Sequence, residues 1–323
     1  MTTTTAIDLF AGAGGFTTGA QAAGAEVLWA ANHWDKAVSL HATNHPTVRE
    51  HVQQDLSEAD WTAVPACDIA LASPACQGFS QAGQPARAGT GGSHRPNPTT
   101  LKAKTQRDRN TAYAVLAMAD TVRPESIVIE NVTDFPRWHA FDAWLSMLGA
   151  FGYSTEVHVL NGKDFGGGQD RPRAVITARL GSKPLRLEVP NRRPRTIGEC
   201  LDPDDHPENR WCPIDSKPGR MQPLMAKAKR GAGERCFWNN VSESRGRSLD
   251  EVFPTATTQS GTQWCLIDGD RIRVLNPREL ARSMSFPETY ALPKNRGLAG
   301  HLIGNAIDVS LSTGVVEQVI AAN

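Results

Sequence analysis

The chain has 323 residues, of which 40% are hydrophobic and 21% charged, which is enough for one large domain and a smaller appendage. This composition excludes a disordered or fibrous protein. No apolar run approaches the roughly 20 residues that span a bilayer, and the N-terminus lacks the features of a signal peptide. We therefore expect a cytoplasmic protein with no membrane partner.

Cysteine spacing argues against both disulfides and metal. The six cysteines form no CxxC pair and show no disulfide-rich spacing, which indicates reduced thiols. Cys200, His206, Cys212 and Cys236 are the most plausible zinc ligands, but their spacing matches no zinc module. We therefore expect no metal site.

Charge is unevenly distributed although the formal net charge is zero. Six basic residues stand against one acidic residue between positions 81 and 110, and fourteen against nine between 183 and 247, so each segment carries +5. Such segregation indicates a basic face of the kind that binds nucleic acid. Solvated charge runs are common, so this feature alone is weak support.

The first 180 residues alternate short apolar strands with helical stretches, which is typical of a doubly wound α/β sheet. Strands are predicted over 6–10, 26–30, a short stretch around 52, 68–72, 126–130, 153–160 and 174–180. Helices are predicted after the first glycine turn, after Asp35 as a cap, over 111–120 with Asn110 as a cap, and over 138–148.

The character of the sequence changes after residue 181. Residues 181–248 are rich in Pro, Arg, Asp and Gly and show no sustained period, which predicts a small irregular domain. Regular patterning resumes over 273–286 and in a closing helix over 310–322. Residues 81–105 form a long Gly/Pro/Arg stretch, and structureless loops of this length are usually functional or disordered.

Residues with chemical potential follow three predicted strands. A glycine cluster (Gly12, Gly14 and Gly15) follows the first strand, where a ligand can approach the backbone, but it does not match GxGxxG. Cys76 follows the fourth strand, and a free cysteine there is by itself usually inert. Glu130 ends another apolar strand at the same expected edge and makes a catalytic site more plausible.

At this point the chain resembles a bacterial DNA cytosine-5 methyltransferase along almost its whole length. The resemblance rests on six motifs in the family's order, each of which alone would be a weak signal. They are the glycine turn at 8–15, the PCQ-like segment 74–80, Glu130-Asn131-Val132, the QxRxR segment 169–173, the block 273–287 and Gly304-Asn305-Ala306. The implied fold is a Rossmann-like S-adenosylmethionine-dependent methyltransferase sheet with a small irregular target-recognition domain.

The resemblance also implies the domain division and the catalytic residues. Residues 1–180, completed by 271–323, would form the catalytic domain, and 181–270 would read the target. A thiolate adding at cytosine C6 activates C5 toward a methyl group, and this role falls to Cys76. Glu130 would hold N3 and the amino group, Arg173 would bind O2, and Arg171 would assist the sugar–phosphate or Cys76. The base must be flipped out of the duplex.

The resemblance further assigns the ligand contacts. S-adenosylmethionine is the implied cofactor, and the residues expected to surround it are Phe10, Gly12, Gly14, Gly15, His33, Trp34, Asp55, Asn305 and Ala306. Double-stranded DNA is the implied partner, contacted by Ser80, Arg87, Lys102, Lys104, Arg109, Gln169 and Arg245. The segment 190–247 holds further arginines that could read guanine or clamp phosphate. We expect a monomer, accompanied by a cognate restriction endonuclease if the enzyme belongs to a restriction–modification system.

Three positions depart from the family pattern. His33 stands where the family has a glutamate for the ribose hydroxyls, Ala75 replaces the proline before the nucleophile, and Asp308 falls in the closing motif. Drift that weakens cofactor binding explains all three, and a pocket adapted to a modified sulfonium donor is the alternative.

Two other functions stay open. An RNA (tRNA) cytosine-5 methyltransferase would share the fold, although the large 181–270 segment argues against it. The second is a non-catalytic DNA-binding protein derived from the family. The presence of Cys76, Glu130, Arg171 and Arg173 argues against it, because a protein without activity does not need all four.

Overall fold

The computed structural model describes residues 3–75, 98–240 and 245–323. Cys76, Ser80 and Arg87, and most of the expected loop 81–105, therefore lie outside the described residues. The chain divides into two compact units, which are described separately below. Unit 1 comprises 1–160, 172–188 and 312–323, and unit 2 comprises 161–171 and 189–311.

A seven-stranded sheet forms the centre of unit 1, in the order β3-β2-β1-β4-β5-β8-β6. The first five strands of this order run parallel, and β8 is antiparallel to β5. The bounds are β1 (Thr5–Leu9), β2 (Glu26–Asn32), β3 (Glu50–Gln53), β4 (Ile69–Ala72), β5 (Ser126–Asn131), β6 (Tyr153–Asn161) and β8 (Pro172–Leu180). The strand order reverses between β1 and β4, and ligands of open α/β sheets bind at such a point.

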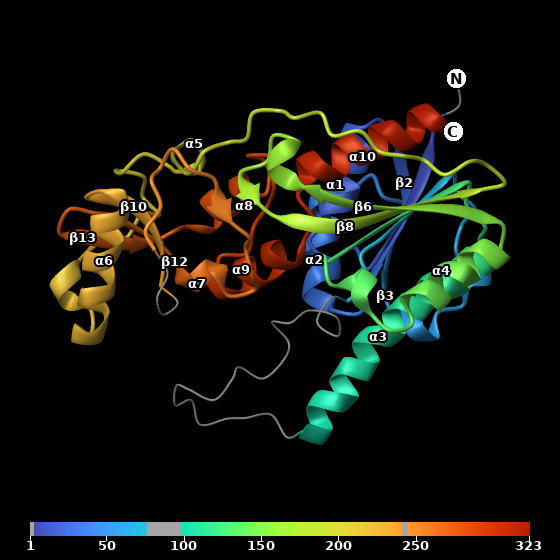
Figure 1. The fold of residues 1–323 in the computed structure, drawn as a ribbon, viewed down its shortest axis with the longest axis horizontal. Helices are drawn as coiled ribbons and strands as arrows, with labels where there is room; N and C mark the ends of the chain where they lie inside the picture. Colours follow the sequence, from blue (N-terminus) through green and yellow to red (C-terminus); the bar gives the residue numbers. More distant parts are fainter. Residues whose placement is uncertain (1–2, 76–97, 241–244) are drawn as a thin grey trace. The chain divides into compact units, whose positions relative to one another are not determined.

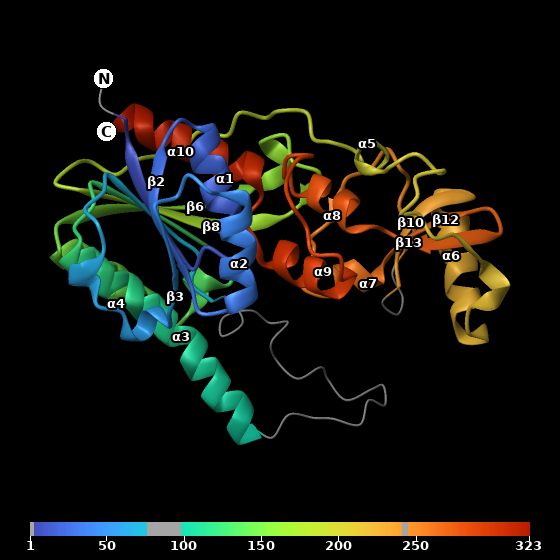
Figure 2. The ribbon, with the colours of Figure 1, turned by 180° about the vertical axis from the view of Figure 1, so that it is seen from behind.

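Helices cover both faces of this sheet (Figures 1 and 2). Helices α1 (Gly15–Ala22), α2 (Asp35–Asn44) and α10 (Val309–Ala322) lie on one face, and α3 (Pro98–Thr121) and α4 (Phe141–Ala150) lie on the other. Two-sided burial explains why β4 (IALA) and β5 (SIVIEN) are buried at every position. The predicted α/β class is confirmed.

Helix α3 corrects one expectation. The sequence predicts a start at Thr111 with Asn110 as the cap, but the helix begins at Pro98. Its first half projects beyond the sheet in both views. This half has no apolar period, and its Ala, Lys, Gln and Arg residues have high intrinsic helix propensity. Lys102, Lys104 and Arg109 therefore lie on a helix rather than in a loop.

Asp35 is also placed differently from the prediction. Trp34 occupies the cap position of α2 without a side-chain cap bond, and Asp35 is the first helical residue. A carboxylate in the first turn still interacts favourably with the helix dipole.

Unit 2 is more regular than its composition suggests. A four-stranded sheet has the order β10-β12-β13-β9, and its neighbouring strands are antiparallel. Its strands are β9 (Cys212–Pro213), β10 (Arg235–Asn239), β12 (Trp264–Asp268) and β13 (Arg271–Val274), and helix α6 (Gln222–Ala232) packs on it through Met225 and Ala228. The prediction of an unpatterned 181–248 missed α6, which has few large apolar residues, and β10, which is only five residues long.

The rest of unit 2 consists of short elements. They are the paired strands β7 (Gln169–Asp170) and β11 (Phe253–Pro254), and the helices α5 (Ile197–Cys200), α7 (Ser260–Gln263), α8 (Pro277–Ser283) and α9 (Arg296–Asn305). Unit 2 also holds residues 271–311, which the sequence analysis assigned to the catalytic domain. Compactness does not reveal which residues read DNA, so the functional division stays a prediction. Among the described residues, no helix is both long and apolar enough to cross a membrane.

Candidate active site

The carboxyl ends of the parallel strands bring the predicted residues of unit 1 to one edge. Leu9 of β1 pairs with Ala31 of β2 and Ala72 of β4, and Ala72 pairs with Ile129 of β5. The glycine turn, the segment that leads to Cys76, and Glu130 follow these paired positions directly. Adjacent strands lie about 4.8 Å apart, so three segments distant in sequence become neighbours.

The turn after β1 needs glycine at two positions. Phe10, Gly12 and Gly14 all have positive φ, at 62°, 56° and 79°. A Cβ on Gly14 would also lie 2.5 Å from His45 Nε2, closer than real contacts allow. Positive φ costs glycine little, whereas Phe10 adopts a conformation that is uncommon for a residue with a side chain. The main chain of this turn therefore adopts a conformation with positive φ at three positions.

Buried polar side chains next to this turn form a hydrogen-bonded network. The Asp8 carboxylate accepts hydrogen bonds from Thr17 N (3.1 Å) and Thr17 Oγ1 (2.7 Å). Thr17 Oγ1 also lies 3.0 Å from His41 Nε2, so with Asp8 ionised the imidazole must donate this bond. The ring of His41 lies 4.6 Å from that of His45 and 5.0 Å from that of His51.

Burial favours the uncharged forms of these groups. It raises the pKa of Asp8 to about 7, against the Thr17 hydrogen bonds that favour the ion. It lowers the pKa of His41 to about 2 and that of His45 to about 4, assisted by repulsion among the imidazoles. Among the described residues, no group of three or more His, Cys, Asp or Glu side chains is arranged to hold a metal ion.

Two hydrogen bonds anchor the segment that leads to Cys76. Asn131 Nδ2 at the end of β5 donates to the Pro74 carbonyl (3.0 Å). The main-chain N of Ala75 donates to Thr111 Oγ1 (2.9 Å), which itself donates to the Asp108 carbonyl (2.6 Å). These contacts fix the chain up to the residue before Cys76. Neither anchor was predicted, and only the Glu130-Asn131-Val132 motif hinted at one of them.

Glu130 and Arg173 meet across the antiparallel pair β5–β8. Arg173 Nε lies 2.8 Å from Glu130 Oε1, and the side chains are 10% and 8% exposed. Arg173 Nη1 also donates to the Pro172 carbonyl. The arginine therefore neutralises and orients the carboxylate in a largely buried setting, where an unpaired charge is costly.

The other expected cofactor residues of unit 1 lie in the segments after β2 and β3. His33 is exposed, Trp34 is half-buried, and Trp34 N donates to Asn32 Oδ1 (3.0 Å). Asp55 is exposed and accepts a hydrogen bond from Ser57 N. Because β1, β2 and β3 are parallel neighbours, these side chains share the edge that carries the glycine turn.

Arg171 and Gln169 are buried in unit 2. The Arg171 guanidinium donates to three main-chain carbonyls at 2.8 Å each, those of Ala256, Gly304 and Ala306. Gln169 donates to Ser283 Oγ and accepts from Ala256 N. Arg171 thus ties the QxRxR segment to the Gly304-Asn305-Ala306 turn, where Asn305 is exposed at the end of α9.

Asp308 has a structural role that explains its departure from the family. Its Oδ1 accepts from Ser310 N (2.9 Å) and Leu311 N (3.2 Å), which caps the first turn of α10. A Cβ on Gly167 would lie 2.6 Å from its Oδ2. Burial raises the pKa of this carboxyl.

Four arginines of unit 2 that were candidates for DNA contacts pair with acidic residues. Arg245 and Arg247 both pair with Glu251, Arg193 pairs with Glu199, and Arg235 with Asp204 and Asp268. The sequence showed these arginines but not their partners.

Comparison with known proteins identifies the family of this chain. The family model described as C-5 cytosine-specific DNA methylase matches residues 4–321. Type II methyltransferase M.NlaX of Neisseria lactamica is 28% identical, over 98% of this chain and 96% of its own. Type II methyltransferase M.HhaI of Haemophilus parahaemolyticus is 25% identical, over 94% and 90%. The solved structure of S. pombe Dnmt2 methyltransferase is 18% identical with a TM-score of 0.69, covering 99% of this chain and 98% of its own, and shows the shared fold.

The chain belongs to the C-5 cytosine-specific DNA methylase family. It is an enzyme of this methyltransferase class, and S-adenosylmethionine is the cofactor that the family implies.

Replacing Asp8 by Asn tests the buried network. The folded-state pKa of Asp8 is raised to about 7, so stability from this group is full below the ordinary pKa of 3.8 and declines as pH rises toward 7. Asparagine cannot ionise, whereas the histidines titrate alike in both proteins. Between pH 5 and pH 8 the Asn variant should therefore gain on the order of 2 kcal/mol relative to wild type in urea unfolding. Parallel pH curves would show that Asp8 is not perturbed.

Thr111→Val tests the anchor of Ala75, with Thr111→Ser as the matched control that keeps the hydroxyl. Valine leaves the Ala75 N–H without its acceptor, at a cost of about 1–2 kcal/mol in unfolding free energy. We expect methyl transfer at saturating substrates to slow at least several-fold in the valine variant, with S-adenosylmethionine affinity unchanged. Equal rates in both variants would show that the anchor does not position the nucleophile segment.

Proposed function

We propose that this enzyme methylates C5 of a flipped-out cytosine in a specific duplex DNA sequence through a covalent adduct with Cys76. The observation that carries the proposal is the convergence of the Cys76 segment with the paired Glu130 and Arg173 at one sheet edge. Asn131 and Thr111 hold the residues before Cys76, and the Arg173 guanidinium orients Glu130.

The chain's residues perform the following chemistry in this proposal. The Cys76 thiolate adds to C6 of cytosine while Glu130 holds N3 and the exocyclic amine. Arg173, already beside Glu130, binds the O2 atom of the ring. Once C5 carries its new methyl group, loss of the C5 proton and breakage of the bond between sulfur and C6 release the product and regenerate the thiolate.

The residues at the edge fit S-adenosylmethionine, which supplies an electrophilic methyl group when bound. The turn 12–15 presents main chain without bulky side chains at the switch point, and Trp34 and Asp55 follow the neighbouring strands β2 and β3 at the same edge of the sheet. We propose that Phe10, Gly12, Gly14 and Gly15 hold the methionine and ribose parts, with Asn305 and Ala306 contributing. Trp34 and Asp55 would contact the adenine, and His33 the ribose.

We propose that residues 181–270 read the target sequence and that the basic residues near α3, including Lys102, Lys104 and Arg109, contact phosphates. Ser80, Arg87, Gln169 and Arg245 complete the proposed DNA contacts. The Type II names of the relatives support DNA as the substrate and a restriction endonuclease as the biological partner. A monomer in the cytoplasm is the form that we expect to act.

Cys76→Ala should abolish methylation and leave S-adenosylmethionine binding intact. Wild type should form an adduct resistant to SDS with duplex DNA that carries 5-fluorocytosine at the target. Fluorine replaces the C5 proton whose loss releases the enzyme, so the bond between sulfur and C6 stays intact. Cys67→Ala is the matched control, since burial raises the pKa of the Cys67 thiol to about 12 and keeps it protonated. Methylation by Cys76→Ala would refute the assignment of Cys76 as the nucleophile. Faster methylation of tRNA than of duplex DNA by wild type would refute duplex DNA as the substrate.

His33→Glu should tighten S-adenosylmethionine binding by roughly 1–2 kcal/mol. A neutral imidazole has one acceptor nitrogen, whereas a carboxylate accepts from both ribose hydroxyls and binds them more strongly. Calorimetry measures the change, and a carboxylated sulfonium analogue serves as the comparison ligand. Weaker S-adenosylmethionine binding after the change would indicate a pocket adapted to a different donor, and unchanged binding would place His33 away from the ribose.

A further inference from the structure

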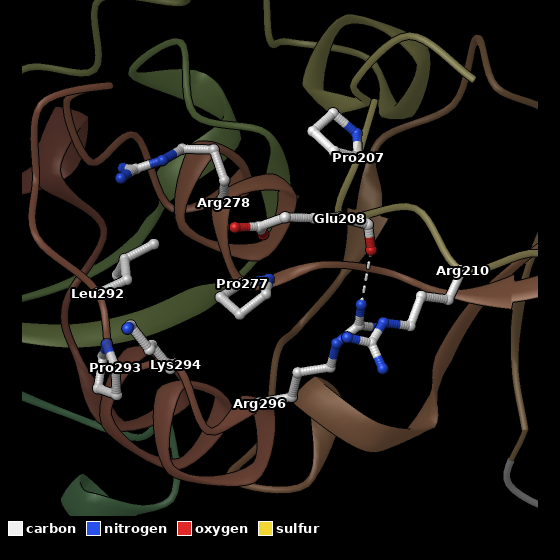
Figure 3. Close-up of a pocket in the computed structure, with 9 residues that line it drawn as sticks. All are labelled: Pro207, Glu208, Arg210, Pro277, Arg278, Leu292, Pro293, Lys294 and Arg296. Carbon is white, nitrogen blue, oxygen red and sulfur yellow. Dashed lines mark hydrogen bonds between the residues drawn. The ribbon is translucent and has the colours of Figure 1, made fainter. Parts of the chain in front are cut away.

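A pocket of about 330 Å³ in unit 2 stands apart from every residue used above as a catalytic or cofactor contact. Figure 3 shows it between the 207–210 loop, the start of α8 at Pro277 and Arg278, and the segment 292–296. Its volume lies near the lower end for ligand sites. Its charged lining comprises four cations, Arg210, Arg278, Lys294 and Arg296, against the single carboxylate of Glu208.

Two of these cations are built into the wall. Arg278 donates to the carbonyls of Pro287 (3.0 Å) and Tyr290 (2.6 Å). Arg296 donates to those of Glu208 (2.8 Å) and Val274 (3.3 Å). In Figure 3 the Glu208 side chain runs away from the guanidinium that binds its main-chain oxygen. The hydrogen bonds hold both guanidiniums in place without neutralising their charge, since carbonyls carry no net charge. Arg278 is also attracted electrostatically to the carboxylate of Glu288.

The other two cations are available to a ligand. Arg210 and Lys294 are exposed, and in the described part of the chain neither forms a hydrogen bond or an ion pair through its side chain. In this they differ from seven other arginines of unit 2, which pair with carboxylates. These are Arg193, Arg235, Arg245, Arg247, Arg271, Arg273 and Arg282.

We propose that this pocket binds one backbone phosphate of duplex DNA, with Arg210 and Lys294 as its direct contacts. The inference rests on the proposed function and adds a contact outside the catalytic residues. Fixed positive charge in a polar hollow suits a phosphodiester, and Arg and Lys contacts to phosphate set the position of a protein on a duplex without reading its sequence. Arg278 and Arg296 add positive charge to the wall of the same pocket.

The test measures duplex DNA binding by the full chain across a series of salt concentrations. In Arg210→Ala/Lys294→Ala, one phosphate contact is lost, so the slope of log K against log salt should become shallower by about 1. The Kd should rise roughly tenfold on specific and unrelated duplexes alike. Arg210→Lys/Lys294→Arg, which keeps both charges, should retain the wild-type slope.

Lys183→Ala/Arg186→Ala is the matched control for the loss of two charges. Both residues are exposed in unit 1 and follow β8. Because β8 is antiparallel to β5, Lys183 lies near the edge of the sheet opposite the glycine turn, and Arg186 follows Leu185, whose carbonyl accepts a hydrogen bond from Thr177 in the middle of β8. This variant should keep the wild-type slope. If its slope changes as much as that of Arg210→Ala/Lys294→Ala, the effect comes from net charge rather than from the pocket, and the proposal is overturned.

The remaining outcomes separate the two proposals. If wild type methylates duplex DNA and Arg210→Ala/Lys294→Ala keeps its slope, the phosphate pocket fails and the proposed function stands. If wild type neither binds nor methylates duplex DNA, both fail. Calorimetry with inorganic pyrophosphate provides the second arm: binding lost in the double variant, with an unchanged DNA slope, would assign the pocket to a free phosphate compound and overturn the DNA assignment. Unchanged S-adenosylmethionine affinity and Tm confirm that the double variant is folded.

Discussion

The buried guanidinium of Arg171 is the constraint on which the loops of unit 2 depend. An arginine cannot shed its proton, so a buried one must find acceptors for its N–H groups. Arg171 finds three carbonyls in two segments, at 256 and at 304–306, and holds both against the 169–171 segment. The fully buried pair of Arg273 and Glu279 does the same for the start of α8, since Glu279 also accepts from Asn276 N.

Unit 1 handles its buried polar groups differently. Asp8, His41 and His45 lie behind the glycine turn in a setting where burial favours their neutral forms. A neutral network leaves little fixed charge beneath a turn that is proposed to receive a sulfonium cofactor. Glu130 is the contrasting case in this unit, because Arg173 compensates its charge directly at 2.8 Å. The carboxylate proposed for base recognition therefore has a fixed partner before any substrate arrives.

The charges of unit 2 explain how a chain of zero net charge is suited to bind a polyanion. Acidic residues neutralise many arginines locally, as Glu251 does for Arg245 and Arg247. Such exposed pairs contribute little to stability, but they reduce non-specific attraction to phosphate. Arg210 and Lys294 are among the cations left without an acidic partner in the described residues, and we propose that they contact phosphate.

The sequence alone determined the class of fold and the order of the motifs, because alternating apolar strands and helices encode a doubly wound sheet locally. It also indicated that Cys76, Glu130 and Arg173 act together, through a pattern of short motifs. The start of α3 at Pro98 escaped prediction, since the polar sequence of its first half has no apolar period. Only the tertiary structure decided that Arg171 binds carbonyls, that Asp308 caps α10, and that Asn131 and Thr111 anchor the segment before Cys76. These contacts join residues far apart in the chain, and a hydrogen bond between distant segments leaves no periodic trace in either of them.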